Sequence, residues 1–202
     1  MIERLPLPER CLTLLEPWTQ AIAYAEKRLE NRSYGVAKPL SEWRYGLGVA
    51  TVPVIGLSQS KGDLPDGKVY SEVTDIMRDL HDRGLWECRG KSPRELNVAA
   101  WRGKLVLCAE LLDVLPPERC AGDPWHVPGQ WGLILGRVWE IAPVPCTGGR
   151  GVWISKWCVQ CGHVYADNAK APGQCKTCGW GSPTQHEHAN RPQLQVVREC
   201  AA

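Results

Sequence analysis

The spacing of apolar residues predicts three helices in the first half of the chain. Residues 17–29 place apolar side chains three or four positions apart, the pattern of one helix face, and Pro17 suits its first turn because a missing N–H costs nothing there. Residues 71–83 show the same spacing, and Gly84 ends that helix. A short third helix is expected from Ser92, where the sequence Ser-Pro-Arg-Glu forms a capping box.

Runs of apolar residues predict strands around and after these helices. Residues 43–57 are rich in Val, Leu and Gly and predict one or two strands. Residues 104–114 are almost continuously apolar and are interrupted by Glu110. Further strands are expected over 131–141 and 151–155, separated by loops that contain Pro and Gly. This order predicts an α+β domain whose sheet curls into a small, partly closed β-barrel with flanking helices.

Two Cys-x-x-Cys-Gly motifs near the C-terminus predict a metal site. Their cysteines are Cys158, Cys161, Cys175 and Cys178, and the glycine after each pair is expected to take a positive φ angle. Four thiolates favour one structural zinc ion, Zn²⁺, and the thirteen residues between the pairs suit the hairpin of a zinc ribbon. An iron site of the rubredoxin type and two redox dithiols are the alternatives.

These patterns divide the chain into three parts. We expect a barrel domain over residues 1–156, with a helical insertion at about 58–103. A zinc ribbon is expected over 157–182, because the cysteine motifs begin where the closing strand ends. The remaining residues, 183–202, are expected to form a flexible tail.

Composition narrows the classes of function. The chain has 24 Lys and Arg against 22 Asp and Glu, and its net charge of +2 is too small to grip duplex nucleic acid by counterion release alone. The N-terminal residues contain no apolar run, and no segment approaches the roughly 20 apolar residues that cross a bilayer. We therefore expect a cytoplasmic protein with reduced thiols and no membrane partner. Among its thiols, Cys108 should be buried and unreactive, and Cys200 should be exposed and reactive.

One segment differs from the nearly neutral whole. Residues 27–44 carry five basic and two acidic side chains, and the chain has ten Trp and five Tyr residues that suit base stacking as well as an ordinary core. The carboxylate of Glu110 in its apolar strand needs a basic partner or a water-filled cleft, and Lys27 or Arg32 is the expected partner. The alternative is a solvated helix end with one structural ion pair.

Two motifs in the first forty residues carry a family resemblance. Residues 16–18 read Glu-Pro-Trp, and residues 27–34 read Lys-Arg-Leu-Glu-Asn-Arg-Ser-Tyr. They resemble the opening of the ASCH domain of the PUA-like superfamily, which typically reads Gln-Pro-Trp-Ala, a helix, Gly-x-Lys-x-x-Glu and Asn-Arg-Ser-Trp. Residues 110–114 resemble the central strand of that family, and 129–153 its closing strands. The resemblance covers roughly residues 10–155.

The resemblance implies a PUA-like barrel with a cleft beside its first helix that accepts RNA, single-stranded DNA or a nucleotide. A few members of the family are hydrolases of a modified nucleoside or ribonucleases. The hydrolases use a Lys, a Thr three residues later and a strand Glu, which Lys27 and Glu110 match, whereas Glu30 replaces the Thr. The nucleic-acid-binding residues that the resemblance implies are Trp18, Lys27, Glu30, Arg32, Ser33 and Glu110.

Three functions are therefore considered. The first is a nucleic-acid-binding module whose cleft holds one unstacked base, which in some relatives is a modified base. The second is an enzyme, a nucleoside hydrolase or a ribonuclease, with Lys27 and Glu110 as catalytic residues. The third is a protein-interaction adaptor that docks on a partner protein through its zinc ribbon.

Overall fold

The structure is a computed structural model that describes residues 3–48, 50–61, 66–86, 98–158, 160–166, 178 and 191–200, with backbone alone for 66–73 and 98–99. The strands are β1 (Arg4–Pro6), β2 (Arg10–Leu14), β3 (Leu29–Arg32), β4 (Val54–Gln59), β5 (Lys104–Leu115), β6 (Trp131–Thr147), β7 (Val152–Trp157), β8 (Val164–Ala166) and β9 (Gln193–Cys200). The helices are α1 (Trp18–Tyr24), α2 (Tyr34–Gly46), α3 (Asp66–Asp82), α4 (Val98–Trp101) and α5 (Pro117–Cys120). This mixed, strand-rich composition confirms the α+β prediction.

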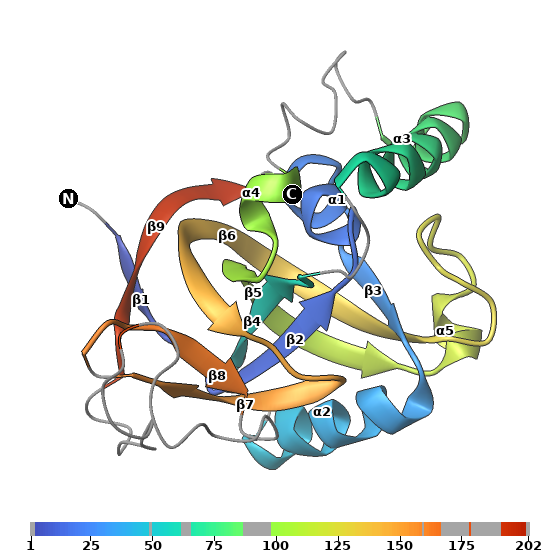
Figure 1. Cartoon of the computed structure of the whole chain (residues 1–202). Helices are drawn as coiled ribbons and strands as arrows, with labels where there is room; N and C mark the ends of the chain where they lie inside the picture. Colours follow the sequence, from blue (N-terminus) through green and yellow to red (C-terminus); the bar gives the residue numbers. More distant parts are fainter. Residues whose placement is uncertain are drawn as a thin grey trace.

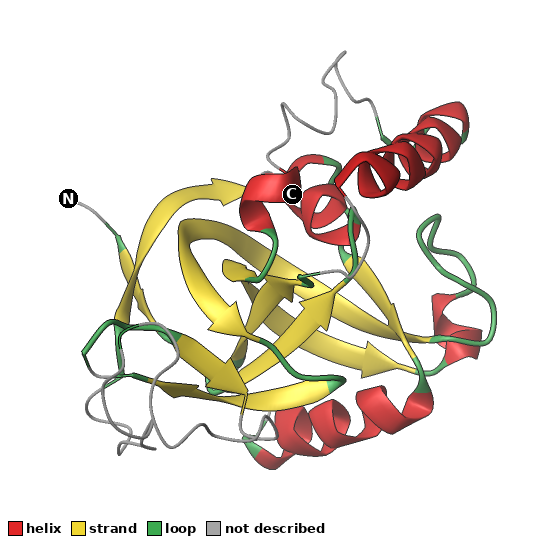
Figure 2. Cartoon of the chain, viewed as in Figure 1, coloured by secondary structure: helices red, strands yellow, loops and turns green. Residues whose placement is uncertain are grey.

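The strands form one sheet that closes into a ring (Figures 1 and 2). The strand order is β1-β9-β6-β5-β4-β2-β7-β8, and β3 pairs with β6. The ring closes because β8 pairs with β7 and also with β6. The long strand β6 takes part in four of these pairings, and its register shifts against β5 and β9 let it bend around the ring.

The helices lie at two ends of this ring (Figure 1). Helices α1, α3 and α4 lie at one end, α2 lies at the other, and β3 connects α1 to α2. Leu12, Leu57, Leu107 and Leu133 are fully buried in a core that also contains residues of α1, α2 and α4. The buried residues of α3 pack with Ala21 in a separate cluster. Helix α3 belongs to the segment between β4 and β5, where a helical insertion was expected.

Two predictions about helices were wrong in part. The helix expected over 17–29 ends at Tyr24, and residues 43–46 continue α2 instead of starting a strand. Helix α2 was missed because Gly35 and Pro39 are poor helix formers, although its buried residues recur at helical spacing. The helix expected from Ser92 begins outside the described residues.

The prediction of a flexible tail over 183–202 was wrong for its last part. Residues 193–200 form β9, which pairs antiparallel with both β1 and β6. This pairing buries Cys200 to 3% exposure, so the expected reactive thiol is shielded, whereas Cys108 is fully buried as predicted. Over residues 193–197, Leu194 and the half-buried Val196 alternate with exposed neighbours, so this part of the strand turns one face toward the sheet.

None of the helices in the described ranges is long and apolar enough to cross a membrane.

Candidate functional site

The end of α1 turns the chain so that Lys27 faces inward. Glu26 takes a left-handed φ of 54°, and the Lys27 N–H donates to the carbonyl of Ala21 at 3.2 Å, so the chain folds back on the last turn of α1. The chain then reverses into β3. As a result, the Lys27 side chain lies between α1 and β3 and is only 1% exposed.

Lys27 belongs to a buried group of charges on β3. Its Nζ atom donates to Glu30 Oε2 at 2.6 Å and to the carbonyl of Leu29 at 2.5 Å. The other oxygen of Glu30 lies 3.0 Å from Arg32, which also donates to the carbonyl of Thr13 at 3.2 Å. One carboxylate therefore stands between two cations, and the group carries one net positive charge.

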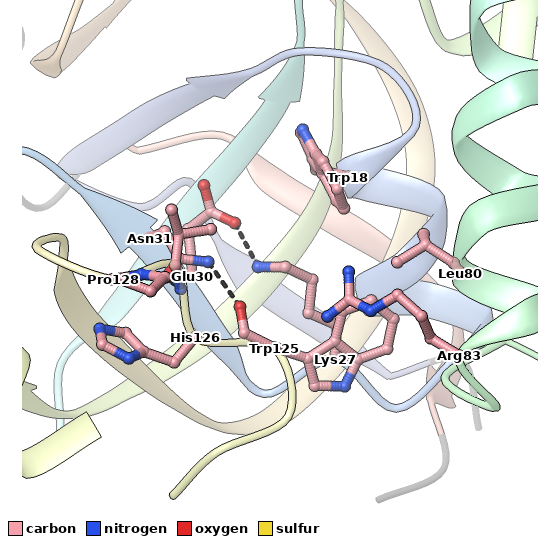
Figure 3. Close-up of a pocket in the computed structure, with 10 residues that line it drawn as sticks. Trp18, Lys27, Glu30, Asn31, Leu80, Arg83, Trp125, His126 and Pro128 are labelled. Atoms are coloured by element: carbon pink, nitrogen blue, oxygen red, sulfur yellow. Dashed lines mark hydrogen bonds and ion pairs between the residues drawn. The ribbon is translucent and has the colours of Figure 1, made fainter. Parts of the chain in front are cut away.

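Lys27 and Glu30 form the floor of a pocket with a volume of about 350 Å³ (Figure 3). Trp18 lies on one side of the Lys27 side chain and Trp125 on the other. The Lys27 ammonium is 5.8 Å from the centre of the Trp18 ring, within the range of a cation–π contact. The remaining lining residues are Glu30, Asn31, Leu80, Arg83, His126, Val127 and Pro128.

Asn31 holds the wall that carries Trp125. Its side-chain amide donates to the carbonyl of Trp125 and accepts from the N–H of Val127, both at 2.8 Å. This paired contact joins β3 to the loop over residues 121–130. A second connection comes from α3, because Arg83 donates to the carbonyl of Pro124 at 3.2 Å. The aromatic wall is thus fixed from two elements.

The structure brings together four of the six residues expected in the cleft. Trp18, Lys27 and Glu30 line the pocket, and Arg32 lies directly behind Glu30. Ser33 is exposed at the start of α2 and is not among the lining residues.

Glu110 does not share this pocket, so the expectation that Lys27 or Arg32 is its partner was wrong. Its carboxylate accepts from Arg137, through the backbone N–H at 3.0 Å and through the guanidinium at 3.0 and 2.7 Å. These hydrogen bonds lower the pKa of the Glu110 carboxyl. The sequence could not reveal this partner because Arg137 faces Glu110 across the bulged pairing of β5 with β6. A catalytic pair of Lys27 and Glu110 is therefore not assembled.

Asn31, Arg83, Trp125 and His126 were missed by the sequence reasoning. Asn31 lies within the recognised motif, next to Glu30, but its partners are 94 and 96 residues away. The loop residues Trp125 and His126 follow Asp123-Pro124, a turn sequence that indicates a loop and no particular chemistry. Arg83 is an exposed residue at the end of a predicted helix, and such a position does not indicate a particular function.

A second candidate site contains three of the four predicted metal ligands. The sulfur atoms of Cys158, Cys161 and Cys178 lie within 4.8 Å of one another, and that of Cys158 is 3.7 Å from that of Cys178. The fourth predicted ligand, Cys175, lies outside the described residues. Three sulfur atoms at this spacing are close enough to bind one metal ion, and the described cysteines form no disulfide.

The first cysteine motif has the expected turn. Gly162 takes a φ of +72°, as its position after the second cysteine predicts. Its N–H donates to the carbonyl of Cys158 at 2.8 Å, and the Cys158 N–H donates to the carbonyl of His163 at 2.9 Å. These bonds direct both thiols of the motif to the same point.

Comparison of the sequence with models of known protein families and with curated proteins finds no match. Chemically, the pocket offers two aromatic faces, one ammonium donor and one carboxylate acceptor. That combination suits a flat ring with a polar edge.

Proposed function

We propose that the pocket binds one unstacked base of RNA, of single-stranded DNA or of a nucleotide. The observation that carries the proposal is the buried Lys27–Glu30 pair in a pocket that Trp18 and Trp125 also line (Figure 3). Every nucleobase has an aromatic face, and stacking on an aromatic side chain contributes about 1–3 kcal/mol per base. Most of the binding free energy is therefore expected from the two Trp residues.

The floor of the pocket provides hydrogen bonds for the edge of the base. Lys27 uses two of its three donors within the described chain, on Leu29 and Glu30, so one donor is left for a ligand. Each oxygen of Glu30 is contacted by one cation and keeps acceptor capacity. A donor beside an acceptor matches a base edge on which a ring nitrogen or carbonyl adjoins an N–H group.

The rim of the pocket suits a phosphate. Arg83 is half exposed, and its ion pair with Asp79, at 3.4 Å, is exposed and therefore weak. Its guanidinium has five N–H donors, and its contacts with Asp79 and Pro124 leave donors for a phosphate oxygen while the bond to Pro124 is kept. The net charge of +2 is too small for the chain as a whole to attract a nucleic acid strongly. The proposal therefore requires a local cation such as Arg83 at the phosphate.

Calorimetric titration of the full chain with the four nucleoside monophosphates tests this function. Trp125→Ala should weaken binding at least fivefold, because one stacking face is removed. Trp43→Ala is the matched control, since Trp43 is also half buried but lies on α2 under the guanidinium of Arg10. Equal losses in the two variants, or no binding by the wild type, would contradict the proposal.

We further propose that residues 1–156 belong to an ASCH domain of the PUA-like superfamily, whose sheet is completed by β8 and β9 from outside this range. Support comes from the motif over residues 27–34, whose Lys27, Glu30 and Arg32 lie together in one charged group. The ring-like sheet with flanking helices agrees with the small barrel of that superfamily.

The cysteine cluster is proposed to hold one structural zinc ion as part of a zinc ribbon. Cys158, Cys161 and Cys178 would be three ligands, and Cys175 the fourth. Thiolates favour zinc over hard cations, and four protein ligands leave no open position for catalysis. The zinc would hold the chain after β7 in place.

A further inference from the structure

A second aromatic surface lies at the other end of β3 from Lys27. The ring of Tyr34 packs on that of Trp131 with 5.3 Å between their centres, and 55% of Tyr34 remains exposed. Lys38, one helical turn further along α2, places its ammonium 6.0 Å from the centre of the Tyr34 ring. We call these three residues the Tyr34 platform.

Arg32 connects the platform with the pocket. Its guanidinium contacts Glu30 on the pocket floor, and its backbone pairs with Trp131 in the β3–β6 ladder. From Glu30 to Tyr34 the chain advances four residues, a span of at most roughly 13 Å. The exposed residues Val127 and Pro128 line the pocket, and Gly129 and Gln130 connect them to Trp131 of the platform. The pocket and the platform therefore lie near the two ends of β3.

The charges around the platform favour an anionic partner. The Lys38 side chain is 55% exposed, and its ammonium lies 3.9 Å from the carboxylate of Glu42, whose side chain is 67% exposed. An exposed pair at that distance contributes little, so the ammonium is available to a phosphate. The first turn of α2 contains no acidic side chain that would repel one.

We propose that the Tyr34 platform stacks a further base of the same strand, so that the ligand is a single-stranded oligonucleotide rather than a mononucleotide. This inference rests on the proposed function, because it places the first base in the pocket. An exposed aromatic ring beside a cation is the arrangement with which proteins hold successive bases of a single strand. The strand would run along β3, with Lys38 at a phosphate and Tyr34 under a base.

Fluorescence anisotropy with labelled single-stranded hexamers of each base, in ribose and deoxyribose forms, tests this inference on the full chain. The wild type should bind the best hexamer at least tenfold more tightly than it binds the corresponding nucleoside monophosphate in competition. Tyr34→Ala should weaken hexamer binding roughly 5- to 150-fold, because one stacked base is lost, and should leave monophosphate binding unchanged. Ribose and deoxyribose hexamers should lose similar amounts, since stacking does not involve the sugar.

Tyr45→Ala is the matched control. Tyr45 lies in the last turn of the same helix, is 57% exposed, and donates its hydroxyl to Asp113 instead of packing on an aromatic ring. The Tyr45→Ala variant should bind the hexamers and the nucleoside monophosphates as tightly as the wild type does. Two results would overturn the proposal: equal affinity of the wild type for hexamers and monophosphates, or normal hexamer binding by Tyr34→Ala. In either case the platform does not bind nucleic acid and is better explained as a protein-contact surface. The proposed binding of a base in the pocket would not be affected. If neither ligand binds, the pocket and the platform both fail.

Discussion

The Nζ atom of Lys27 lies 2.6 Å from Oε2 of Glu30, although the two side chains are only 2% and 7% exposed. Removing two charges from water is costly, and their attraction repays the cost only when further hydrogen bonds satisfy both groups. Here the carbonyl of Leu29 and the guanidinium of Arg32 supply those bonds. The pair therefore adds little net stability, and its value lies in presenting a fixed donor and acceptor to a ligand.

Lys27→Met should destabilise the fold strongly. It leaves the Glu30 carboxylate buried with Arg32 as its one remaining counter-ion, and breaking a buried pair from one side costs about 3–5 kcal/mol. Urea unfolding followed by circular dichroism measures the loss. The double variant Lys27→Met/Glu30→Gln should recover part of it, because the buried carboxylate is removed and the Arg32 guanidinium that loses this partner is 18% exposed. If the loss of unfolding free energy in the double variant equalled the sum of the losses in the two single variants, the coupling between Lys27 and Glu30 would be contradicted.

Asn31→Ala should loosen the wall of the pocket without unfolding the chain. Two hydrogen bonds of 2.8 Å disappear, one of them from the N–H of Val127. The N–H of Val127 should then exchange with solvent much faster, as measured by hydrogen exchange, while the N–H groups of β5 and β6 keep their protection. Unchanged protection at Val127 would show that the loop does not depend on Asn31.

Protein purified under reducing conditions should carry about one zinc ion per chain, as measured by elemental mass spectrometry. Cys161→Ser should reduce the zinc content to near zero, because it removes one of three converging sulfur atoms. Cys200→Ala is the control, since its thiol is buried in β9 outside the cluster. Iron in place of zinc, or equal metal content in both variants, would contradict the assignment.

The buried thiols should make stability depend on pH in the alkaline range. Burial raises the pKa of Cys108 from 9.0 to about 12, and that of Cys146 likewise to about 12. Because the folded-state pKa lies above the unfolded value, the stabilisation is complete below about pH 8.5 and is lost as the pH rises toward 12. The free energy of unfolding of Cys108→Ala should fall less steeply with pH than that of the wild type. If the free energies of unfolding of Cys108→Ala and the wild type fell equally steeply with pH, the raised pKa of Cys108 would be contradicted.

Much of the framework could be predicted because it follows local patterns. The almost continuous apolar run over residues 104–114 became β5, and the helix predicted over 71–83 overlaps α3, which ends at Asp82. Strand β9 was missed because buried and exposed side chains alternate only over its first half, residues 193–197, and residues 197–199 are all exposed. Its identity as a strand comes from its pairing with β6, a long-range contact that no local pattern contains.

The pocket could be predicted only on the side formed by its own motif. Lys27, Glu30 and Arg32 are close in sequence, and the turn at Glu26 brings them together. The opposite wall depends on the loop that carries Trp125, which is placed by side-chain hydrogen bonds from Asn31 and Arg83. Such contacts join segments that lie tens of residues apart, so a single sequence does not reveal them.

The most direct test of the base-binding pocket uses the indole N–H signals of the ten Trp residues in a ¹⁵N–¹H correlation spectrum. Individual Trp→Phe variants assign the signals, and a nucleoside monophosphate is then added stepwise. The signals of Trp18 and Trp125 should shift progressively with ligand concentration, whereas those of the buried Trp139 and Trp153 should stay in place. No shift at millimolar nucleotide, or shifts that spare both Trp18 and Trp125, would contradict the claim that this pocket binds a base.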